Sequence, residues 1–208
     1  MSEREGSHRE PEMTGFLLVV PMRVERAALG RRLPGSVRTG MGPRRSAAAV
    51  PAVRAALDRG VHSGLLIVGV CGGLTDALAP GELVVGSELR GPDGTLPCGR
   101  TQPVAEALRG AGLTVHVGPI HTADRLVGGP GRAALAATGA LAVDLESAIL
   151  ATAAGDRPVL VVRAVSDTPS HPLLSAGIVR NGLTALRSLR AAAPVLAAAP
   201  HHSEREVG

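Results

Sequence analysis

Apolar runs alternate with amphipathic stretches along most of the chain. The apolar runs predict buried strands at 16–21, 64–73, 81–89, 113–123 and 157–167. Between them, stretches with helical periodicity predict helices at 22–33, 44–60, 144–154 and 175–199, with Pro51 kinking or breaking the second helix. Continuous apolar strands that alternate with helices are typical of a mostly parallel sheet covered on both faces. The pattern therefore predicts an α/β fold.

The two ends of the chain lack this pattern. Residues 1–13 and 201–208 are polar, and we expect them to be disordered tails around one domain at 14–200. A chain of 208 residues with 45% hydrophobic residues can form one sizeable core. No signal peptide is recognisable, and no run reaches the roughly 20 apolar residues of a membrane span. The sequence therefore predicts a cytoplasmic protein.

Composition and charge narrow the classes of partner. The formal net charge is +4, and the arginines are scattered as on an ordinary soluble surface, although an anionic ligand or an acidic membrane surface stays open. One Phe, no Tyr and no Trp leave almost no aromatic surface on which bases could stack. Cys71 and Cys98 form no disulfide framework, and no Cys or His spacing matches a metal site. We therefore expect no nucleic-acid partner and no metal.

Polar residues and glycines gather where the predicted strands end, and ligands of α/β folds bind at the carboxyl ends of strands. The first strand is followed by Glu25, the second ends in the glycine pair 72–73, and the last ends at Asp167. Asp167, at the rim of a dry core, either caps the following turn or serves as a general acid. Glu25 taken alone lies between two arginines, and this context favours a solvent-exposed charge on a helix over an active-site residue.

Two acids, Asp144 and Glu146, interrupt the apolar stretch "ALAVDLESAIL". Burying a carboxylate without a partner costs several kcal/mol, so each acid needs an explanation. Asp144 fits an N-cap that accepts the N–H of Glu146 or Ser147. Glu146 then lies in the first helical turn, where it either faces the positive end of the helix dipole or binds a ligand.

Other site motifs are excluded by their spacing. The glycines of "GMGP" and "GVCGG" fit neither a phosphate-binding Walker loop nor a dinucleotide fingerprint. The Gly-x-Ser of "VGSEL" lacks the second glycine of a nucleophile elbow, so a serine hydrolase has no support.

Four stretches, taken in order, resemble the nucleoside phosphorylase/nucleosidase superfamily: "VVPMRVERAAL", "LLIVGVCGGLTDALAPGELVV", "LAVDLESAILATAA" and "VLVVRAVSDT". The resemblance covers about residues 15–190. It implies a three-layer αβα sandwich with a twisted, mixed central sheet, and a homo-oligomer between a dimer and a hexamer. It also implies cleavage of an N-ribosidic bond of a small-molecule nucleoside through an oxocarbenium-like transition state, without a cofactor.

The resemblance assigns roles to residues motif by motif. Asp167 matches the aspartate that protonates the leaving purine, Glu146 the glutamate that binds the ribose 2′- and 3′-hydroxyls, and Glu25 the glutamate that activates water in the nucleosidases. Further substrate contacts are expected from Val70, Cys71, Gly72, Leu126, Leu145 and Ser166. Leu126 takes the place of an aromatic residue that stacks on the purine in the nucleosidases.

The chain departs from the hexameric phosphorylases at their phosphate site. Val70 replaces the serine that binds phosphate there, and Ile67 replaces an arginine on the same strand. Phosphate as a co-substrate would therefore need other arginines, for which Arg23 and Arg44 are the candidates. Arg180, 13 residues after Asp167 (180 − 167), matches an arginine that assists the aspartate in those phosphorylases.

Within the superfamily, "RTGMGP", "VDLES" and the segment that begins "SDTPSHPL" look most like the hopanoid-biosynthesis phosphorylases. This resemblance implies adenosylhopane as substrate, adenine as product and work close to a membrane surface. The alternative is a hydrolytic nucleosidase that acts on methylthioadenosine/S-adenosylhomocysteine or futalosine. A further alternative is a nucleoside-binding protein without activity, against which the joint presence of Glu25, Glu146 and Asp167 argues.

Overall fold

The computed structural model describes residues 15–30, 33, 36–172 and 177–198. The tails predicted at 1–13 and 201–208 lie outside these residues. The strands are β1 Phe16–Val20, β2 Val37–Arg38, β3 Gly64–Gly73, β4 Leu83–Gly91, β5 Gly94–Pro97, β6 Val115–Thr122, β7 Ala142–Asp144 and β8 Val159–Asp167. The helices are α1 Arg23–Leu29, α2 Pro43–Asp58, α3 Thr101–Gly110, α4 Gly129–Ala137, α5 Ser147–Ala151 and α6 Ile178–Ala198.

The eight strands form one mixed sheet in the order β2-β1-β3-β7-β6-β4-β5. The remaining strand, β8, pairs in parallel with β3 and antiparallel with β4. These two pairings close the circuit β3-β7-β6-β4-β8, so the middle of the sheet curls back on itself. The predicted α/β class with a mixed central sheet is confirmed.

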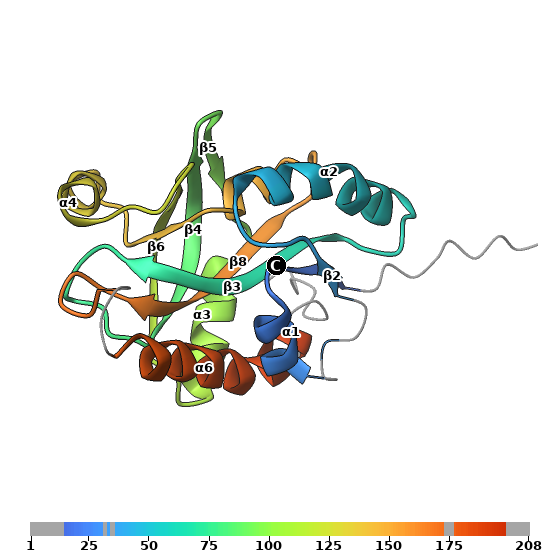
Figure 1. Ribbon diagram of the computed structural model, residues 1–208. Helices are drawn as coiled ribbons and strands as arrows, with labels where there is room; N and C mark the ends of the chain where they lie inside the picture. Colours follow the sequence, from blue (N-terminus) through green and yellow to red (C-terminus); the bar gives the residue numbers. More distant parts are fainter. Residues whose placement is uncertain (1–14, 31–32, 34–35, 173–176, 199–208) are drawn as a thin grey trace, which may run out of the picture.

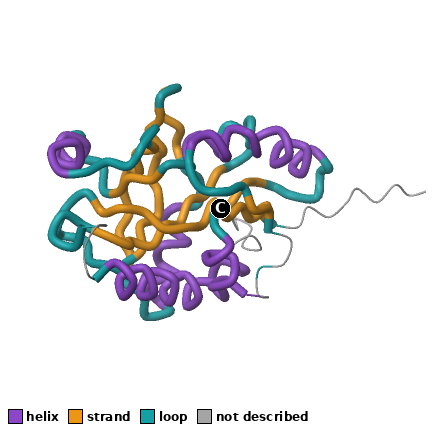
Figure 2. The backbone as a smooth tube through the Cα atoms, viewed as in Figure 1, coloured by secondary structure: helices purple, strands orange, loops and turns teal. Residues whose placement is uncertain are grey.

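Helices cover both faces of this sheet (Figures 1 and 2), and an apolar core lies between the sheet and the helices on each face. One core joins the strands to α2 through Val53 and Leu57 and to α5 through Leu150. The other joins them to α1, α3 and α6, where Leu108 and Leu189 are fully buried. Burial of about 25 cal/mol per Å² of apolar surface on both faces is the main force that holds the three layers together.

The strongest apolar patterns give elements close to those predicted, and the weaker ones do not. The helix predicted across Pro51 is unbroken, because Pro51 and the residue four positions before it are exposed and the freed carbonyl can be hydrated. The helix predicted to start at residue 144 begins at Ser147, since 142–144 pair as β7. The prediction missed β2, β5, β7, α3 and α4.

Candidate active site

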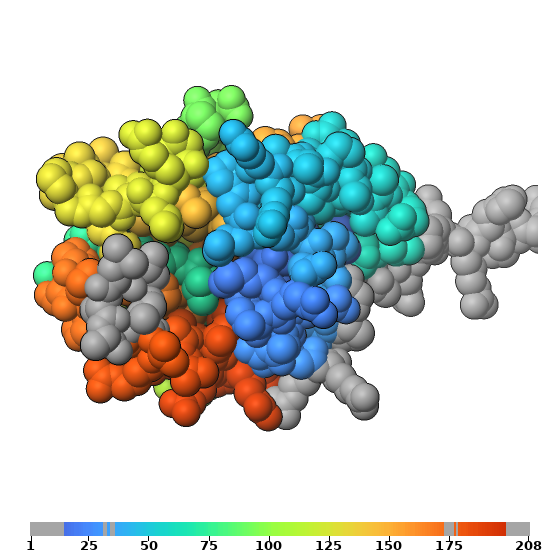
Figure 3. All heavy atoms as spheres, in the orientation of Figure 1, coloured from blue at the N-terminus to red at the C-terminus, as the bar shows by residue number. Residues whose placement is uncertain are grey.

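The elements converge on a cavity of about 430 Å³ at the carboxyl ends of β3 and β8. We call it the acid-lined cavity, because Glu25, Asp144, Glu146 and Asp167 all contribute to its wall. It also brings together the other predicted substrate contacts, Val70, Cys71, Gly72, Leu126, Leu145 and Ser166. Figure 3 shows this face, where the blue region of α1, the cyan start of α2 and the red α6 meet around the end of β3.

A larger hollow of about 690 Å³ lies beside this cavity and shares residues 125–127 with it. Its wall contains His121, Asp124 and Arg125 but none of the four acids. The acid-lined cavity is therefore the candidate active site, although it is the smaller of the two.

An irregularity in strand pairing shapes the end of β8. Cys71 pairs with Val165, but the next residue of β3, Gly72, pairs with Asp167, so Ser166 is bulged out of register. Bulges re-aim side chains and are common beside active sites. The Ser166 hydroxyl lies 3.0 Å from the Cys71 carbonyl and 2.7 Å from Asp167 Oδ1. It therefore fixes the Asp167 carboxyl at the rim of the cavity.

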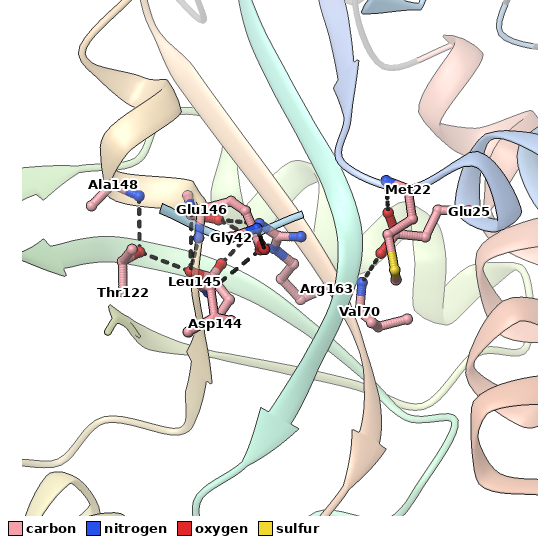
Figure 4. Close-up of polar contacts among 11 residues, drawn as sticks. Met22, Glu25, Gly42, Val70, Thr122, Asp144, Leu145, Glu146, Ala148 and Arg163 are labelled. Atoms are coloured by element: carbon pink, nitrogen blue, oxygen red, sulfur yellow. Dashed lines mark hydrogen bonds and ion pairs between the residues drawn. The ribbon is translucent and has the colours of Figure 1, made fainter. Parts of the chain in front are cut away.

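Glu25 is buried in the first turn of α1, and both of its carboxyl oxygens accept backbone N–H groups (Figure 4). Oε2 accepts the N–H of Met22 at 2.7 Å, and Oε1 accepts the N–H of Val70 at 2.8 Å. The second bond ties the start of α1 to the end of β3. Burial raises the pKa of Glu25, against the lowering effect of Arg163 and these two hydrogen bonds.

Asp144 and Glu146 are held by a third charge, Arg163 of β8 (Figure 4). Arg163 is fully buried, and its Nη2 lies 2.9 Å from Asp144 Oδ2 and 3.7 Å from Glu146 Oε2. The same guanidinium donates from Nε and Nη2 to the Ser147 hydroxyl. Two acids in an apolar stretch are therefore explained by a buried cation on the neighbouring strand.

Asp144 also does what was predicted of it: Oδ1 accepts the N–H groups of Glu146 at 3.2 Å and Ser147 at 3.1 Å. Glu146 is instead the N-cap residue of α5, and its Oε1 reaches back to the N–H of Gly42 at 2.9 Å. Burial raises the pKa of Glu146, while Arg163 works in the opposite direction. Glu146 thus lies between the loop before α2 and the cavity.

The environment of Arg163 keeps it charged. Burial disfavours the cation, but Asp144, Glu146 and Glu25 outweigh burial and raise its pKa. Its Nη1 is buried and has no hydrogen-bond partner among the described residues. A Cβ on Gly69 would lie 2.2 Å from this Nη1 and 2.8 Å from Glu25 Oε1, so Gly69 leaves room for both groups.

Asp167 has a cationic partner of its own, Arg132 of α4. Arg132 Nη2 donates to Asp167 Oδ2, and Nη1 and Nε donate to the carbonyls of Gly73 and Val127. Asp167 therefore accepts from Ser166 on one oxygen and from Arg132 on the other.

The three predicted anion-binding arginines are not brought to this site. Arg23, Arg44 and Arg180 are exposed and do not line the acid-lined cavity. They lie on the outer faces of α1, α2 and α6, where water solvates an arginine better than a cavity wall does.

Sequence reasoning missed the two arginines that do contact the acids. Arg163 carries a usable signal, because a charge inside "VLVVRAV" needs a buried partner as much as Asp144 does. Arg132 lies in a stretch rich in Gly and Ala and carries no such signal. Cys71 is buried as predicted, and burial raises the pKa of its thiol, which disfavours a thiolate nucleophile.

Two absences hold for the part of the chain that the structure describes. It contains no group of three or more His, Cys, Asp or Glu side chains placed to hold a metal ion. It also contains no helix with the length and apolar character needed to cross a bilayer.

The model of one protein family, the phosphorylase superfamily, matches residues 21–177. The chain belongs to the phosphorylase superfamily. This confirms, at the level of the superfamily, the resemblance found in its motifs. No curated protein sequence matches the chain.

Solved structures of two nucleosidases and a futalosine hydrolase resemble this chain in fold. A 5′-methylthioadenosine/S-adenosylhomocysteine nucleosidase from Helicobacter pylori has a TM-score of 0.71 at 16% identity, over 90% of this chain and 97% of that one. The enzyme of that name from Neisseria meningitidis has a TM-score of 0.70 at 19% identity, over 89% and 99%. Futalosine hydrolase from Helicobacter pylori has a TM-score of 0.69 at 16% identity, over 88% and 96%. At these identities the likeness concerns the fold.

Proposed function

We propose that this protein is an enzyme that hydrolyses the N-ribosidic bond of an adenosine-type nucleoside in the acid-lined cavity. The observation that carries the proposal is the convergence of three carboxyl groups from distant segments, Glu25, Glu146 and Asp167, on one cavity. Membership of the phosphorylase superfamily and the folds of nucleosidase structures support the same chemistry.

Asp167 is the proposed acid and Glu146 the proposed sugar-binding group. Asp167 donates its proton to the purine as the bond between C1′ and N9 breaks, so the base leaves neutral; a general acid typically contributes 10²–10⁴-fold. Glu146 accepts hydrogen bonds from the hydroxyls of the ribose, and its negative charge offsets the positive charge that develops on the ring. The Gly42 N–H holds one of its oxygens in place.

Glu25 is proposed to hold the attacking water. Glu25 lines the cavity, and both of its carboxyl oxygens are oriented by backbone N–H groups. Arg163, fully buried behind the cavity wall, supplies a positive charge that favours the ionised form of Glu25. A water molecule that hydrogen-bonds to Glu25 gives its proton to this carboxylate as the water oxygen bonds to C1′. The raised pKa of Glu25 makes it a stronger base than an ordinary carboxylate.

The arginines favour water over phosphate as the nucleophile. Arg23, Arg44 and Arg180 are exposed outside the cavity wall. Of the two arginines that contact the acids, Arg163 is matched by Asp144 and Glu146, and Arg132 is matched by Asp167. Arg125 also lines the cavity, but it is exposed, so water competes with an anion for it. A phosphate dianion would therefore meet cations that already have carboxylate partners or are solvated.

An apolar surface at the mouth of the cavity supports an apolar group on the 5′ side of the nucleoside. Val24, Met41 and Leu126 line the cavity and are 53%, 56% and 70% exposed. Val179 and Leu183, also exposed, flank the lining residues of α6. A methylthio group fits such a surface, as does the much larger triterpene of adenosylhopane, for which the protein would work beside a membrane.

Base release from a panel of nucleosides tests the proposal. The purified protein is incubated with methylthioadenosine, S-adenosylhomocysteine, futalosine and an adenosine with a long 5′-alkyl group, with and without phosphate. We expect base release from at least one of them at a rate that phosphate does not change, and its loss in Asp167→Asn. Release that requires phosphate would contradict hydrolysis, and no release from any would contradict the activity.

A further inference from the structure

Arg132 stands in the wall between the acid-lined cavity and a neighbouring hollow. This side cavity has a volume of about 510 Å³ and is lined by Leu74, Thr168 and residues of α4, including Arg132 itself. The Arg132 side chain is 12% exposed and the Asp167 side chain 5%. Arg132 therefore lines both cavities, and the side cavity offers space next to this side chain.

Arg132 donates hydrogen bonds to several acceptors at the end of the acid-lined cavity where the purine is proposed to bind. It donates to Asp167 Oδ2, to the Val127 carbonyl at 2.9 Å and to the Gly73 carbonyl at 3.1 Å. Asp167 Oδ1 already accepts the Ser166 hydroxyl at 2.7 Å. A guanidinium offers only donors and stabilises a carboxylate, whereas the proposed reaction needs Asp167 to hold a proton and face the purine.

The close approach depends on a residue without a side chain. A Cβ on Gly72 would lie 2.7 Å from Arg132 Nη2 and 3.2 Å from Asp167 Oδ2. The ion pair therefore lies against the backbone of β3, at the strand end that lines the cavity. A purine edge that binds Asp167 Oδ2 has to compete with the guanidinium for that oxygen.

From these contacts we infer that Arg132 is a gate residue, paired with Asp167 in the empty site and displaced toward the side cavity when the purine binds. This inference rests on the proposed function. Once free of the guanidinium, Asp167 takes a proton from solvent and hands it to the base as the C1′–N9 bond breaks. Asp167 is then a carboxylate again, and Arg132 returns to it and expels the base. Arg132 is thus a positioning residue that acts through Asp167 and favours product release.

The binding of free adenine tests the gate. Dissociation constants are measured by calorimetry for the wild-type protein, Arg132→Gln and Arg132→Lys, with Arg109→Gln as control. Arg109 ties the end of α3 to the Val115 carbonyl, and neither residue lines the acid-lined cavity. Arg109→Gln therefore measures the effect of losing an arginine–carbonyl tether outside the site. We expect Arg132→Gln to bind adenine about tenfold more tightly, since no ion pair has to open. Arg132→Lys and Arg109→Gln should stay within about threefold of wild type.

Steady-state kinetics give a second readout, because a residue with a purely structural role would not lower KM and kcat together. In Arg132→Gln both KM and kcat should fall, because substrate binds without breaking the pair and adenine leaves slowly. Unchanged or weaker adenine binding in Arg132→Gln would overturn the gate, because it would make Arg132 a structural tether or a direct ligand of the base.

Hydrogen exchange of the wild-type protein keeps the inference testable if Arg132→Gln does not fold. Added adenine should speed the exchange of amides in α4, as the tether to Asp167 opens; slower or unchanged exchange would overturn the gate. If the wild-type protein cleaves nucleosides but fails these tests, only the gate role of Arg132 is overturned. If it neither binds adenine nor cleaves a nucleoside, the proposed function is overturned as well.

Discussion

Replacing Arg163 by methionine should destabilise the protein more than any exposed charge change. Arg163 is fully buried, and its two carboxylate partners, Asp144 and Glu146, have side chains only 1% and 7% exposed. Methionine keeps most of the volume but leaves both carboxylates without a counterion. Removing one partner of a buried ion pair costs about 3–5 kcal/mol. For a chain of this size that corresponds to a fall in Tm of roughly 6–20 °C.

Urea unfolding at pH 7 measures this loss, with Arg157→Met as the matched control. Arg157 pairs with Asp58 at 3.2 Å, but these side chains are 35% and 56% exposed. An exposed pair contributes about 0–1 kcal/mol, so the control should lose no more than that. A loss below about 1 kcal/mol in Arg163→Met would refute the view that this cation neutralises the buried acids.

The pH dependence of the same measurement has a defined sign. Among the groups that lower the pKa of Glu146 against the raising effect of burial, Arg163 has the largest effect, so its removal raises that pKa further. The folded variant then takes up a proton at a higher pH than its unfolded chain does. Folding is therefore favoured as pH falls through that pKa, and the difference from wild type should shrink on acidification. A difference that grows in acid would contradict this reasoning.

Three further predictions concern the reaction. Glu146→Gln should lower kcat/KM about 10- to 100-fold, because a charged hydrogen bond to the sugar contributes about 1.5–3 kcal/mol. Unchanged kinetics would contradict the role of Glu146 in sugar binding. The rate should fall in acid with a midpoint above 4.5, the ordinary value for a glutamate, since burial raises the pKa of Glu25 and the base must be ionised; Glu25→Gln should abolish this limb, and a limb that survives contradicts the assignment. Gly69→Ala should displace Arg163 and Glu25 and destabilise the fold by about 1–3 kcal/mol, whereas Gly110→Ala, with open space at its Cβ position, should be close to neutral in urea unfolding.

Part of the fold could be predicted from the sequence, because two of its signals are strong. Gly64–Gly73 and Val159–Asp167 are long apolar runs that are buried on both faces, and their predicted bounds agree closely with β3 and β8. Short elements such as Val37–Arg38 and Ala142–Asp144 owe their conformation to pairing with β1, β3 and β6, which local patterns do not contain.

The acids of the candidate site could be found from the sequence for a related reason. Asp144, Glu146 and Asp167 are conspicuous because each lies in or at the end of an apolar run. Glu25 is different: its sequence context indicates a solvated charge, but the N–H of Val70, 45 residues further on, draws it into the core. Arg132 reaches Asp167 from 35 residues away through the placement of α4, which only the three-dimensional fold determines.

Isotope transfer from water tests the central claim, hydrolysis of an N-ribosidic bond in the acid-lined cavity, most directly. The cleavage is run in H₂¹⁸O with a nucleoside that the protein accepts, and the released sugar is analysed by mass spectrometry. We predict one ¹⁸O atom on C1 of the sugar, in phosphate-containing and phosphate-free buffer alike, and loss of the labelled product in Asp167→Asn. A sugar phosphate without the label, or labelled product formed equally by Asp167→Asn, would contradict the account.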